Sequence, residues 1–385
     1  MITEAVQRWR PTRVVLDSLT EVRLLSRDSV RYRRQILALK EFLRSRKATT
    51  LFLGESAHPE YDVEAATIVH GVVALEQELG PDGMDRRHLR VEKYRGSDYA
   101  AGVHAARIVG GGLKVYPRLV APLQDPRVER STLPSGVAAL DRLLGGGLER
   151  GTCTMIGGNS GVGKSSVGLA ILAAAAARGE RAVLYSFDEW PAEVLHRCEA
   201  IGLAVRGPME RGQLVVRKVN PLGLPPEQFC NWVRAEVERE GARLVMIDTV
   251  NGYELCTRDR AGFLSHLQQL VGYLKARAVT LILVNEIAKV TGELTMSETG
   301  LSFIVDNTVL LKAFEAGGAL RKAIGVTRKR LGPHDDRFYE FRVTAQGLHV
   351  GGLLSRLRGI LQGETVRDGP PSRTPPDVAA GPGDG

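Results

Sequence analysis

One eight-residue segment constrains this chain more than any other feature: Gly158-Asn-Ser-Gly-Val-Gly-Lys-Ser165. Glycines let the backbone wrap closely and point its N–H groups inward, which makes a concave nest for anionic oxygens. Lys164 and Ser165, at the end of this pattern, are placed to reach the β- and γ-phosphates of a nucleotide and its Mg²⁺ ion. The segment therefore predicts a loop that binds a nucleoside triphosphate. Its candidate binding residues are Gly158, Asn159, Ser160, Gly161, Val162, Gly163, Lys164, Ser165 and Ser166.

The neighbours of this loop favour the same interpretation. Thr152–Ile156 is a short apolar strand candidate, and the alanine-rich segment Ser166–Ala177 favours a helix. The positive end of that helix dipole would face the phosphates. A plain glycine turn between a strand and a helix is the alternative, and the complete pattern disfavours it.

Apolar runs alternate with helical patterns after the loop, which predicts a doubly wound α/β sheet. The predicted parallel strands are Thr152–Ile156, Arg181–Phe187, Gln213–Arg217, Leu244–Asp248 and Thr280–Asn285, with helices such as Pro226–Glu240 and Gly262–Arg277 between them. Shorter runs follow Glu286 and predict an antiparallel extension: Asn307–Phe314, Leu320–Lys329 and Phe338–Thr344.

The chain also repeats itself. Arg13–Asp17 matches Leu244–Asp248, and Thr49–Glu55 matches Thr280–Glu286, both at an offset of 231 residues. The first copy carries no counterpart of the phosphate loop, so we interpret it as the rear part of a nucleotide-binding domain. The sequence predicts four parts: a partial domain (1–118), a linker (119–130), a complete domain (131–355) and a disordered tail rich in Gly and Pro (356–385).

Composition is that of a globular protein, with 43% hydrophobic and 25% charged residues. The N-terminus has no apolar signal core, and the four cysteines form no CxxC pair, which is typical of free thiols in a reducing cytoplasm. We expect a cytoplasmic protein without a membrane segment or a metal cluster. A net charge of +8 permits nucleic-acid binding, but the surplus lacks a dense run and we interpret it as an arginine-rich solvated surface.

Carboxylates follow two of the predicted strands. Asp248 ends the apolar run Leu244–Ile247, where it can place Mg²⁺ together with Ser165, because the carboxyl ends of parallel strands face the ligand crevice. Asp188 and Glu189 follow another strand, and one of them is a candidate to activate a water or a hydroxyl. Only one fits that role, since adjacent residues of an extended strand point to opposite sides. The alternative is that this pair caps a helix that starts at Pro191.

A basic cluster lies further along the chain: Arg328, Lys329, Arg330 and His334. One interpretation is an edge strand that its charges keep soluble. The other is an arginine finger, formed by Arg328 and Arg330, that reaches the γ-phosphate of a neighbouring subunit. Because Lys93 and Arg95 repeat the pattern in the first copy, we favour the finger.

Together these motifs resemble the KaiC family of RecA-like ATPases over residues 1–355. The segments that carry the resemblance are Ser131–Gly151 ahead of the phosphate loop, Phe187-Asp188-Glu189 for the paired catalytic acids, Ile247-Asp248-Thr249 for the magnesium strand, and Lys93–Ser97 with the looser Arg328-Lys329-Arg330 for the trans-acting basic motif. Asp188 shortens the first acid of the family's pair by one methylene, and Leu331 replaces a glycine of the basic motif.

The resemblance implies tandem domains in a double-ring hexamer, with MgATP bound and hydrolysed between subunits and regulatory protein partners. For clock members it also implies serine/threonine autophosphorylation of the second domain. Ser302-Phe303 stands where those members carry adjacent Ser-Thr acceptors. Ser302 is therefore the candidate phosphoacceptor, and a two-site cycle is not expected.

Two other functions fit a phosphate loop. A recombinase- or helicase-like motor would line a central channel with the loop after Glu286, but Ile287–Gly300 holds one lysine against Glu293 and Glu298. The matching segment Ser56–Ala66 is also acidic, whereas a nucleic-acid channel is expected to be basic or aromatic. The sequence thus argues against DNA. A nucleotide-gated scaffold with little turnover stays open.

Overall fold

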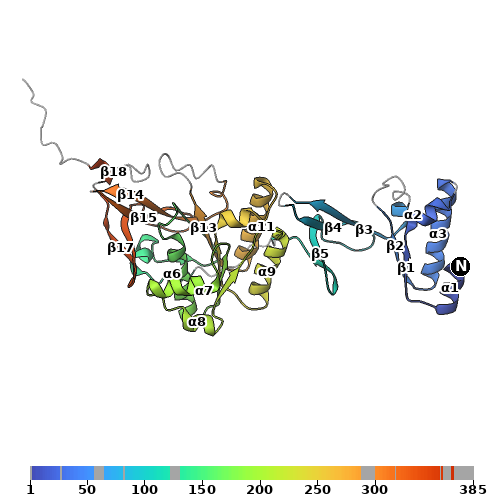
Figure 1. Ribbon diagram of the computed structural model, residues 1–385, viewed down its shortest axis with the longest axis horizontal. Coiled ribbons are helices and arrows are strands. Elements are labelled where there is room, and N and C mark those ends of the chain that lie inside the picture. The colour runs from blue at the N-terminus through green and yellow to red at the C-terminus, as the bar shows by residue number, and fades with distance from the viewer. Residues whose placement is uncertain are drawn as a thin grey trace, which may run out of the picture. The chain divides into compact units, whose positions relative to one another are not determined.

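The computed structural model describes residues 2–26, 28–55, 65–80, 83–121, 131–287, 300–316 and 318–355, and the backbone of 357–358 and 366–367. The chain divides into two compact units (Figure 1). Unit 1 comprises Met1–Gln77 and Arg87–Val115, and unit 2 comprises Glu78–Arg86 and Tyr116–Gly385. The domain boundaries predicted from the sequence stay a prediction.

Unit 2 is built on a nine-stranded sheet with the order β11-β10-β12-β13-β9-β14-β15-β16-β17. Neighbouring strands from β11 to β14 pair in parallel, and those from β14 to β17 pair antiparallel. The predicted RecA-like fold with an antiparallel extension is thereby confirmed. The strands are β9 (Cys153–Gly158), β10 (Ala182–Ser186), β11 (Leu214–Lys218), β12 (Leu244–Asp248), β13 (Thr280–Glu286), β14 (Asn307–Ala316), β15 (Ala319–Lys329), β16 (Tyr339–Thr344) and β17 (Gly347–Leu353).

Helices cover both faces of this sheet, because its central strands are apolar on both sides. On one face, α6 and α7 pack in a cluster with Met246 and Ile282, and on the other, α9 and α11 pack in a cluster with Ile247 and Leu283. The helices are α5 (Ala138–Leu143), α6 (Lys164–Ala177), α7 (Pro191–Ala200), α8 (Arg206–Glu210), α9 (Pro226–Glu238), α10 (Val250–Glu254) and α11 (Arg260–Ala276). A short ladder of β7 (Thr132–Leu133) with β8 (Leu148–Glu149) precedes β9.

Two segments differ in part from the expectation. Leu119, within the predicted linker, is buried in the core of unit 2, and residues 122–130 of that linker lie outside the described residues. The predicted disordered tail contains a two-residue ladder between β18 (Leu357–Arg358) and β19 (Val366–Arg367). The other residues of 356–385 lie outside the described part of the chain.

Unit 1 contains a parallel pair, β1 with β2, and a four-stranded sheet in the order β3-β4-β5-β6. Leu19 of α2 and Tyr32 and Ile36 of α3 form a small core with Ala65 and Ile68. The elements are α1 (Ile2–Trp9), β1 (Arg13–Asp17), α2 (Leu19–Leu24), α3 (Ser29–Ser45), β2 (Thr49–Leu53), β3 (Gly71–Leu79), β4 (Asp85–Tyr94), β5 (Val103–Val109) and β6 (Gly112–Tyr116). The last two residues of β3, the first two of β4 and the last residue of β6 fall within unit 2.

The repeat relates one buried face in unit 2 to an exposed face in unit 1. Met246 and Ile282 are fully buried in the cluster beneath α6. Their counterparts at the 231-residue offset, Val15 and Leu51, are 57% and 56% exposed. The described residues of unit 1 therefore leave these two side chains largely uncovered.

Among the residues that the structure describes, no helix combines the length and the apolar character needed to cross a bilayer.

The two matched positions give a stability prediction. Ile282→Ala should lower the free energy of unfolding by about 2–5 kcal/mol, because it leaves a cavity beneath α6. Leu51→Ala is the matched control and should stay within about 0.5 kcal/mol, since that side chain is already solvated. Chemical denaturation of both variants measures the difference, and equal losses would contradict the assignment of the core.

Candidate active site

The phosphate loop has the geometry that its glycines predict. Gly163, the N-cap of α6, has φ +107, a conformation that side chains with a Cβ rarely adopt. At Gly158 a Cβ would lie 2.2 Å from the carbonyl oxygen of Leu311 on the adjacent strand. Both positions therefore require glycine. The α6 helix begins at Lys164, two residues before the predicted start.

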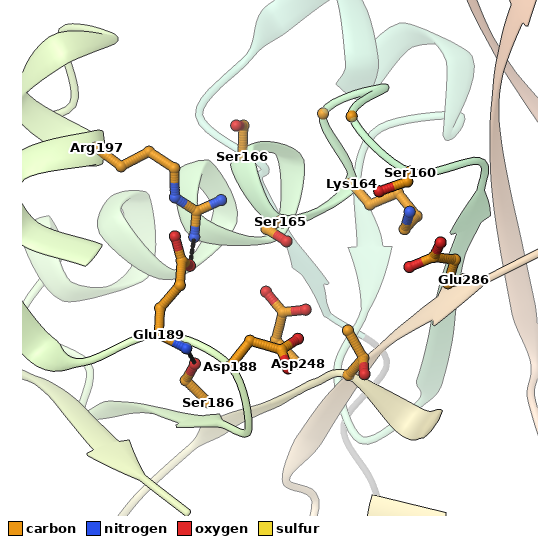
Figure 2. A pocket seen from close by; sticks show the side chains of 13 residues that line it. Ser160, Lys164, Ser165, Ser166, Ser186, Asp188, Glu189, Arg197, Asp248 and Glu286 are labelled. Carbon is orange, nitrogen blue, oxygen red and sulfur yellow. Dashed lines mark hydrogen bonds and ion pairs between the residues drawn. The ribbon is translucent and has the colours of Figure 1, made fainter. Parts of the chain in front are cut away.

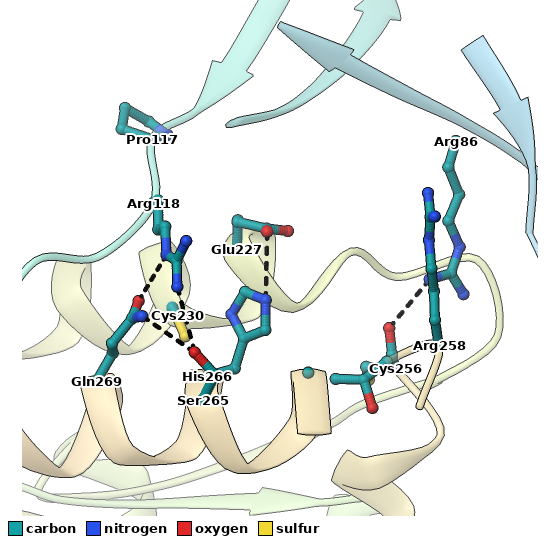
Figure 3. Close-up of polar contacts among 12 residues, drawn as sticks. Arg86, Pro117, Arg118, Glu227, Cys230, Cys256, Arg258, Ser265, His266 and Gln269 are labelled. Carbon is teal, nitrogen blue, oxygen red and sulfur yellow. Dashed lines mark hydrogen bonds and ion pairs between the residues drawn. The ribbon is translucent and has the colours of Figure 1, made fainter. Parts of the chain in front are cut away.

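Four parallel strands bring the site together at their carboxyl ends. Gly158 ends β9 opposite Glu286 of β13, and Ser186 of β10 lies opposite Asp248 of β12. A cavity of about 340 Å³ opens there (Figure 2). Its lining residues are Ser160, Gly161, Gly163, Lys164, Ser165, Ser166, Ser186, Asp188, Glu189, Arg197, Asp248, Thr249 and Glu286.

Lys164 lies within this cavity and is 7% exposed. Its Nζ donates to the carbonyl oxygen of Asn159 at 2.7 Å. Burial lowers the pKa of Lys164, and the negative charges of Glu286 and Asp248 act in the opposite direction. The ammonium group thus stands in an acidic cavity at the start of a helix, where an anion is stabilised.

Asp248 is the buried carboxylate of the site. It is 5% exposed, and burial raises its pKa, while a hydrogen bond with the Ser165 hydroxyl favours the charged form. A desolvated carboxylate beside a hydroxyl oxygen presents hard oxygen ligands, which suit Mg²⁺. Ser165 and Asp248 therefore fit the predicted metal role.

The two acids Asp188 and Glu189 have different neighbours in the site. Figure 2 shows Asp188 beside Asp248, whereas the Glu189 side chain extends to Arg197 of α7, with which it forms an ion pair. The backbone N–H of Glu189 donates to Ser186 Oγ at 2.9 Å. Neither acid caps α7, because Trp190 occupies the N-cap position and the carboxylate of Glu193 accepts its N–H at 2.6 Å. The alternative interpretation of this pair as a helix cap is therefore wrong.

The structure brings most of the predicted site residues to this cavity, but not all. The lining residues that sequence reasoning did not assign to the site are Ser186, Arg197, Thr249 and Glu286. Glu286 carried a usable signal, because it ends a predicted strand as Asp248 does. The predicted loop residues that do not line the cavity are Gly158, Asn159 and Val162. The Val162 side chain packs in the hydrophobic core.

The predicted basic motif lies outside the cavity of its own chain. The Arg328 guanidinium donates to the carbonyl oxygen of Ser302, so the structure places the candidate finger beside the candidate phosphoacceptor. Lys93 of the first copy likewise donates to the carbonyl oxygen of Ala66. Neither Arg328 nor Ser302 lines the cavity.

The two adjacent residues Lys329 and Arg330 of this motif have different partners. Lys329 has a side chain only 1% exposed and pairs with Glu149 at 2.7 Å, and it also donates to the carbonyl oxygen of Leu144 in the glycine-rich segment ahead of the loop. Arg330 is 45% exposed and pairs at 3.2 Å with Asp306, a buried carboxylate that Lys275 also contacts at 2.8 Å. The buried Lys329 side chain thus ties the strand to the segment ahead of the loop, whereas the Arg330 side chain is accessible to solvent.

Residues 288–299 of the loop after Glu286 and residues 56–64 of its counterpart lie outside the described residues. The prediction that these loops disfavour DNA stays a prediction.

Comparison with known proteins agrees with this geometry. The family model described as ATPase: KaiC matches residues 1–120 and 133–355. The circadian clock protein KaiC3 of Synechocystis sp. is 24% identical over 368 residues, which cover 94% of this chain and 72% of the relative. The circadian clock oscillator proteins KaiC of Synechococcus elongatus and Thermostichus vulcanus are 25% and 26% identical, each over 95% of this chain and 71% of the relative.

The different partners of the basic motif predict different costs for two adjacent substitutions. Lys329→Met should lower the free energy of unfolding by about 3 kcal/mol, because it leaves the Glu149 carboxylate without its cation. Arg330→Met is the matched control and should cost less than about 1 kcal/mol, since Lys275 still neutralises Asp306. Equilibrium unfolding in urea measures both, and a larger loss for Arg330→Met would reverse the assignment.

Proposed function

This chain belongs to the KaiC family of ATPases, and we propose that it binds and hydrolyses MgATP at the loop Gly158–Ser165. The observation that carries the proposal is the shared cavity, in which Lys164 and Ser165 of α6, Glu189 after β10 and Asp248 of β12 converge. Phosphoryl transfer depends on positioning and charge stabilisation. The cavity offers groups for both.

Each group has a proposed role. Lys164 leaves the Asn159 carbonyl and neutralises the β- and γ-phosphates, as the terminal lysine of a phosphate loop does. Ser165 and Asp248 would hold Mg²⁺, which would neutralise phosphate charge when bound. Glu189 accepts a proton from the attacking water, and Asp188, beside Asp248, would orient water near these residues.

We further propose that a homo-oligomer, a hexamer, completes the site. Within the described residues, the cations that line the cavity are Lys164 and Arg197, and Arg197 is paired with Glu189. A transition state with charge on three phosphoryl oxygens gains from a further cation. Arg330 is accessible at 45% exposure, and the Arg328 guanidinium contacts the Ser302 carbonyl outside the cavity, so a neighbouring subunit can supply both.

A regulatory role follows from nucleotide-dependent assembly, with other proteins as the proposed partners and the cytoplasm as the proposed compartment. Ser302 is the proposed acceptor of an autokinase reaction. Its carbonyl oxygen accepts from Arg328, so a phosphate on Ser302 would stand beside a guanidinium, a favourable pair.

The main prediction concerns Lys164→Ala. Phosphate release from MgATP should fall by about 10²–10³-fold, because a cation that stabilises transferred phosphate charge is removed. Nucleotide-dependent assembly, followed by light scattering, should be lost as well. Lys47→Ala, at an exposed lysine of unit 1, is the control and should leave both unchanged. A wild-type chain that assembles with MgATP but releases no phosphate would favour the scaffold instead.

The autokinase proposal has a separate test. Incubation with γ-labelled ATP should place label on the chain, and Ser302→Ala should remove it while phosphate release continues. Mass spectrometry of the labelled peptide identifies the acceptor. Label that persists in Ser302→Ala would assign the modification to another residue, and absence of label on the wild type would limit the activity to hydrolysis.

A further inference from the structure

One arginine in the cavity has no part in the roles above. Arg197 lies on α7, a helix fixed at its start by the Glu193–Trp190 hydrogen bond of 2.6 Å. Two α7 residues that flank it in sequence, Val194 and Cys198, are fully buried in the core beneath α6. The backbone that carries Arg197 is therefore anchored on both sides.

The direction of this side chain follows from helix geometry. Side chains of an α-helix tilt toward its N-terminus, so an arginine in the last turn of α7 reaches back to the residues that precede the helix. Glu189 stands there, two residues before Pro191, and its carboxylate pairs with Arg197. The Glu189 backbone is held as well, since its N–H donates to Ser186 Oγ at 2.9 Å.

The charges around Glu189 explain why its ion pair with Arg197 matters for the site. Burial raises the pKa of Glu189, and the carboxylates of Asp248, Glu193 and Asp188 raise it further, whereas the Arg197 guanidinium lowers it. The two side chains are only 28% and 33% exposed, so solvent screens their attraction less than that of a surface pair. Removal of Arg197 would leave Glu189 free to turn away from its acidic neighbours.

We propose that Arg197 is a positioning residue: its guanidinium holds the Glu189 carboxylate in one orientation at the nucleotide cavity, so that this carboxylate faces the attacking water. In the step concerned, Glu189 takes a proton from water as the water oxygen bonds to the γ-phosphorus, and the bond to the ADP oxygen breaks. Arg197 takes no proton. The inference rests on the proposed function for its catalytic consequence, but the pair itself exists without nucleotide.

A different role for the same residue is that of a direct γ-phosphate ligand. The Arg197 side chain lines the cavity, and its buried Nε has no hydrogen-bond partner among the described residues. The two roles differ in what they change. A ligand of the bound nucleotide contributes to its affinity, whereas a residue that orients the base contributes to the chemical step.

Steady-state kinetics separate the roles. Arg197→Gln should lower kcat for phosphate release about tenfold and leave the KM for ATP within about twofold, since general-base catalysis contributes about 10²–10⁴-fold and part of it survives. Arg197→Lys should recover part of the loss, because it restores the charge without the planar fork. A raised KM at unchanged kcat would overturn the inference in favour of the ligand role, and unchanged kinetics would overturn both.

A double-mutant cycle links the loss to Glu189. Arg197→Gln should reduce kcat in the wild-type background and have no further effect in Glu189→Gln, because the group that it orients is then already disabled. Additive losses would contradict the inference. The control is Arg206→Gln, which breaks an exposed pair of 2.6 Å with Glu199, another residue of α7, and should change neither kcat nor KM.

A measurement without turnover keeps this inference distinct from the proposed function. In nucleotide-free protein, the shift of the urea midpoint caused by Arg197→Gln should be larger in the wild type than in Glu189→Gln. Equal shifts would show that the pair is absent and would overturn the inference. A wild-type chain that releases no phosphate would contradict the proposed function, and the midpoint cycle would then decide whether Arg197 holds Glu189.

Discussion

The site depends on a carboxylate that the fold buries against a hydroxyl, with Lys164 and Arg197 as the cations that act on it within the same cavity. Asp248 ends the central strand β12 at 5% exposure, beneath the first turn of α6, with the Ser165 hydroxyl as its hydrogen-bond partner. Burial of a carboxylate costs free energy unless a positive group compensates it. The parallel register places Ser186 beside this residue and Glu286 beside the loop, so the cavity collects negative charge around the place where Mg²⁺ and a nucleotide fit.

The residues of the basic motif at the end of β15 make contacts in different directions. Because side chains alternate across a strand, Lys329 turns inward and anchors the glycine-rich segment ahead of the phosphate loop through Glu149 and the Leu144 carbonyl. Arg328 contacts the Ser302 carbonyl, and Arg330, just after the strand, pairs with Asp306. The same three-residue segment thus ties the phosphate-loop region to the sheet and presents two guanidinium groups outside the chain's own cavity.

Sequence reasoning identified the parts of the site that local patterns encode. The loop Gly158–Ser165 and the strand that ends at Asp248 could be predicted, because glycine spacing and a terminal acid after an apolar run are local signals. Arg197 could not be predicted as a cavity residue, since its helical pattern gives no sign of an ion pair with the acid before the helix. The N-cap at Trp190 could not be predicted either, because the Trp190 side chain makes no cap hydrogen bond and its backbone N–H donates instead to the Glu193 carboxylate. Contacts between distant segments, such as Lys329 with Leu144, need the fold itself.

The central claim is that a catalytic site forms from two protomers, with the phosphate loop on one and the arginines on the other. Subunit mixing tests it most directly. Protomers with Glu189→Gln keep their phosphate loop and their arginines but lack the base, and protomers with Arg330→Gln keep their loop and base, so each alone should release little phosphate. Mixed in equal amounts and assembled with MgATP, they should recover about a quarter of wild-type phosphate release, because one neighbouring pair in four then joins an intact loop and base to an intact arginine. Phosphate release that stays at the level of the separate variants, in particles shown to contain both, would contradict the account.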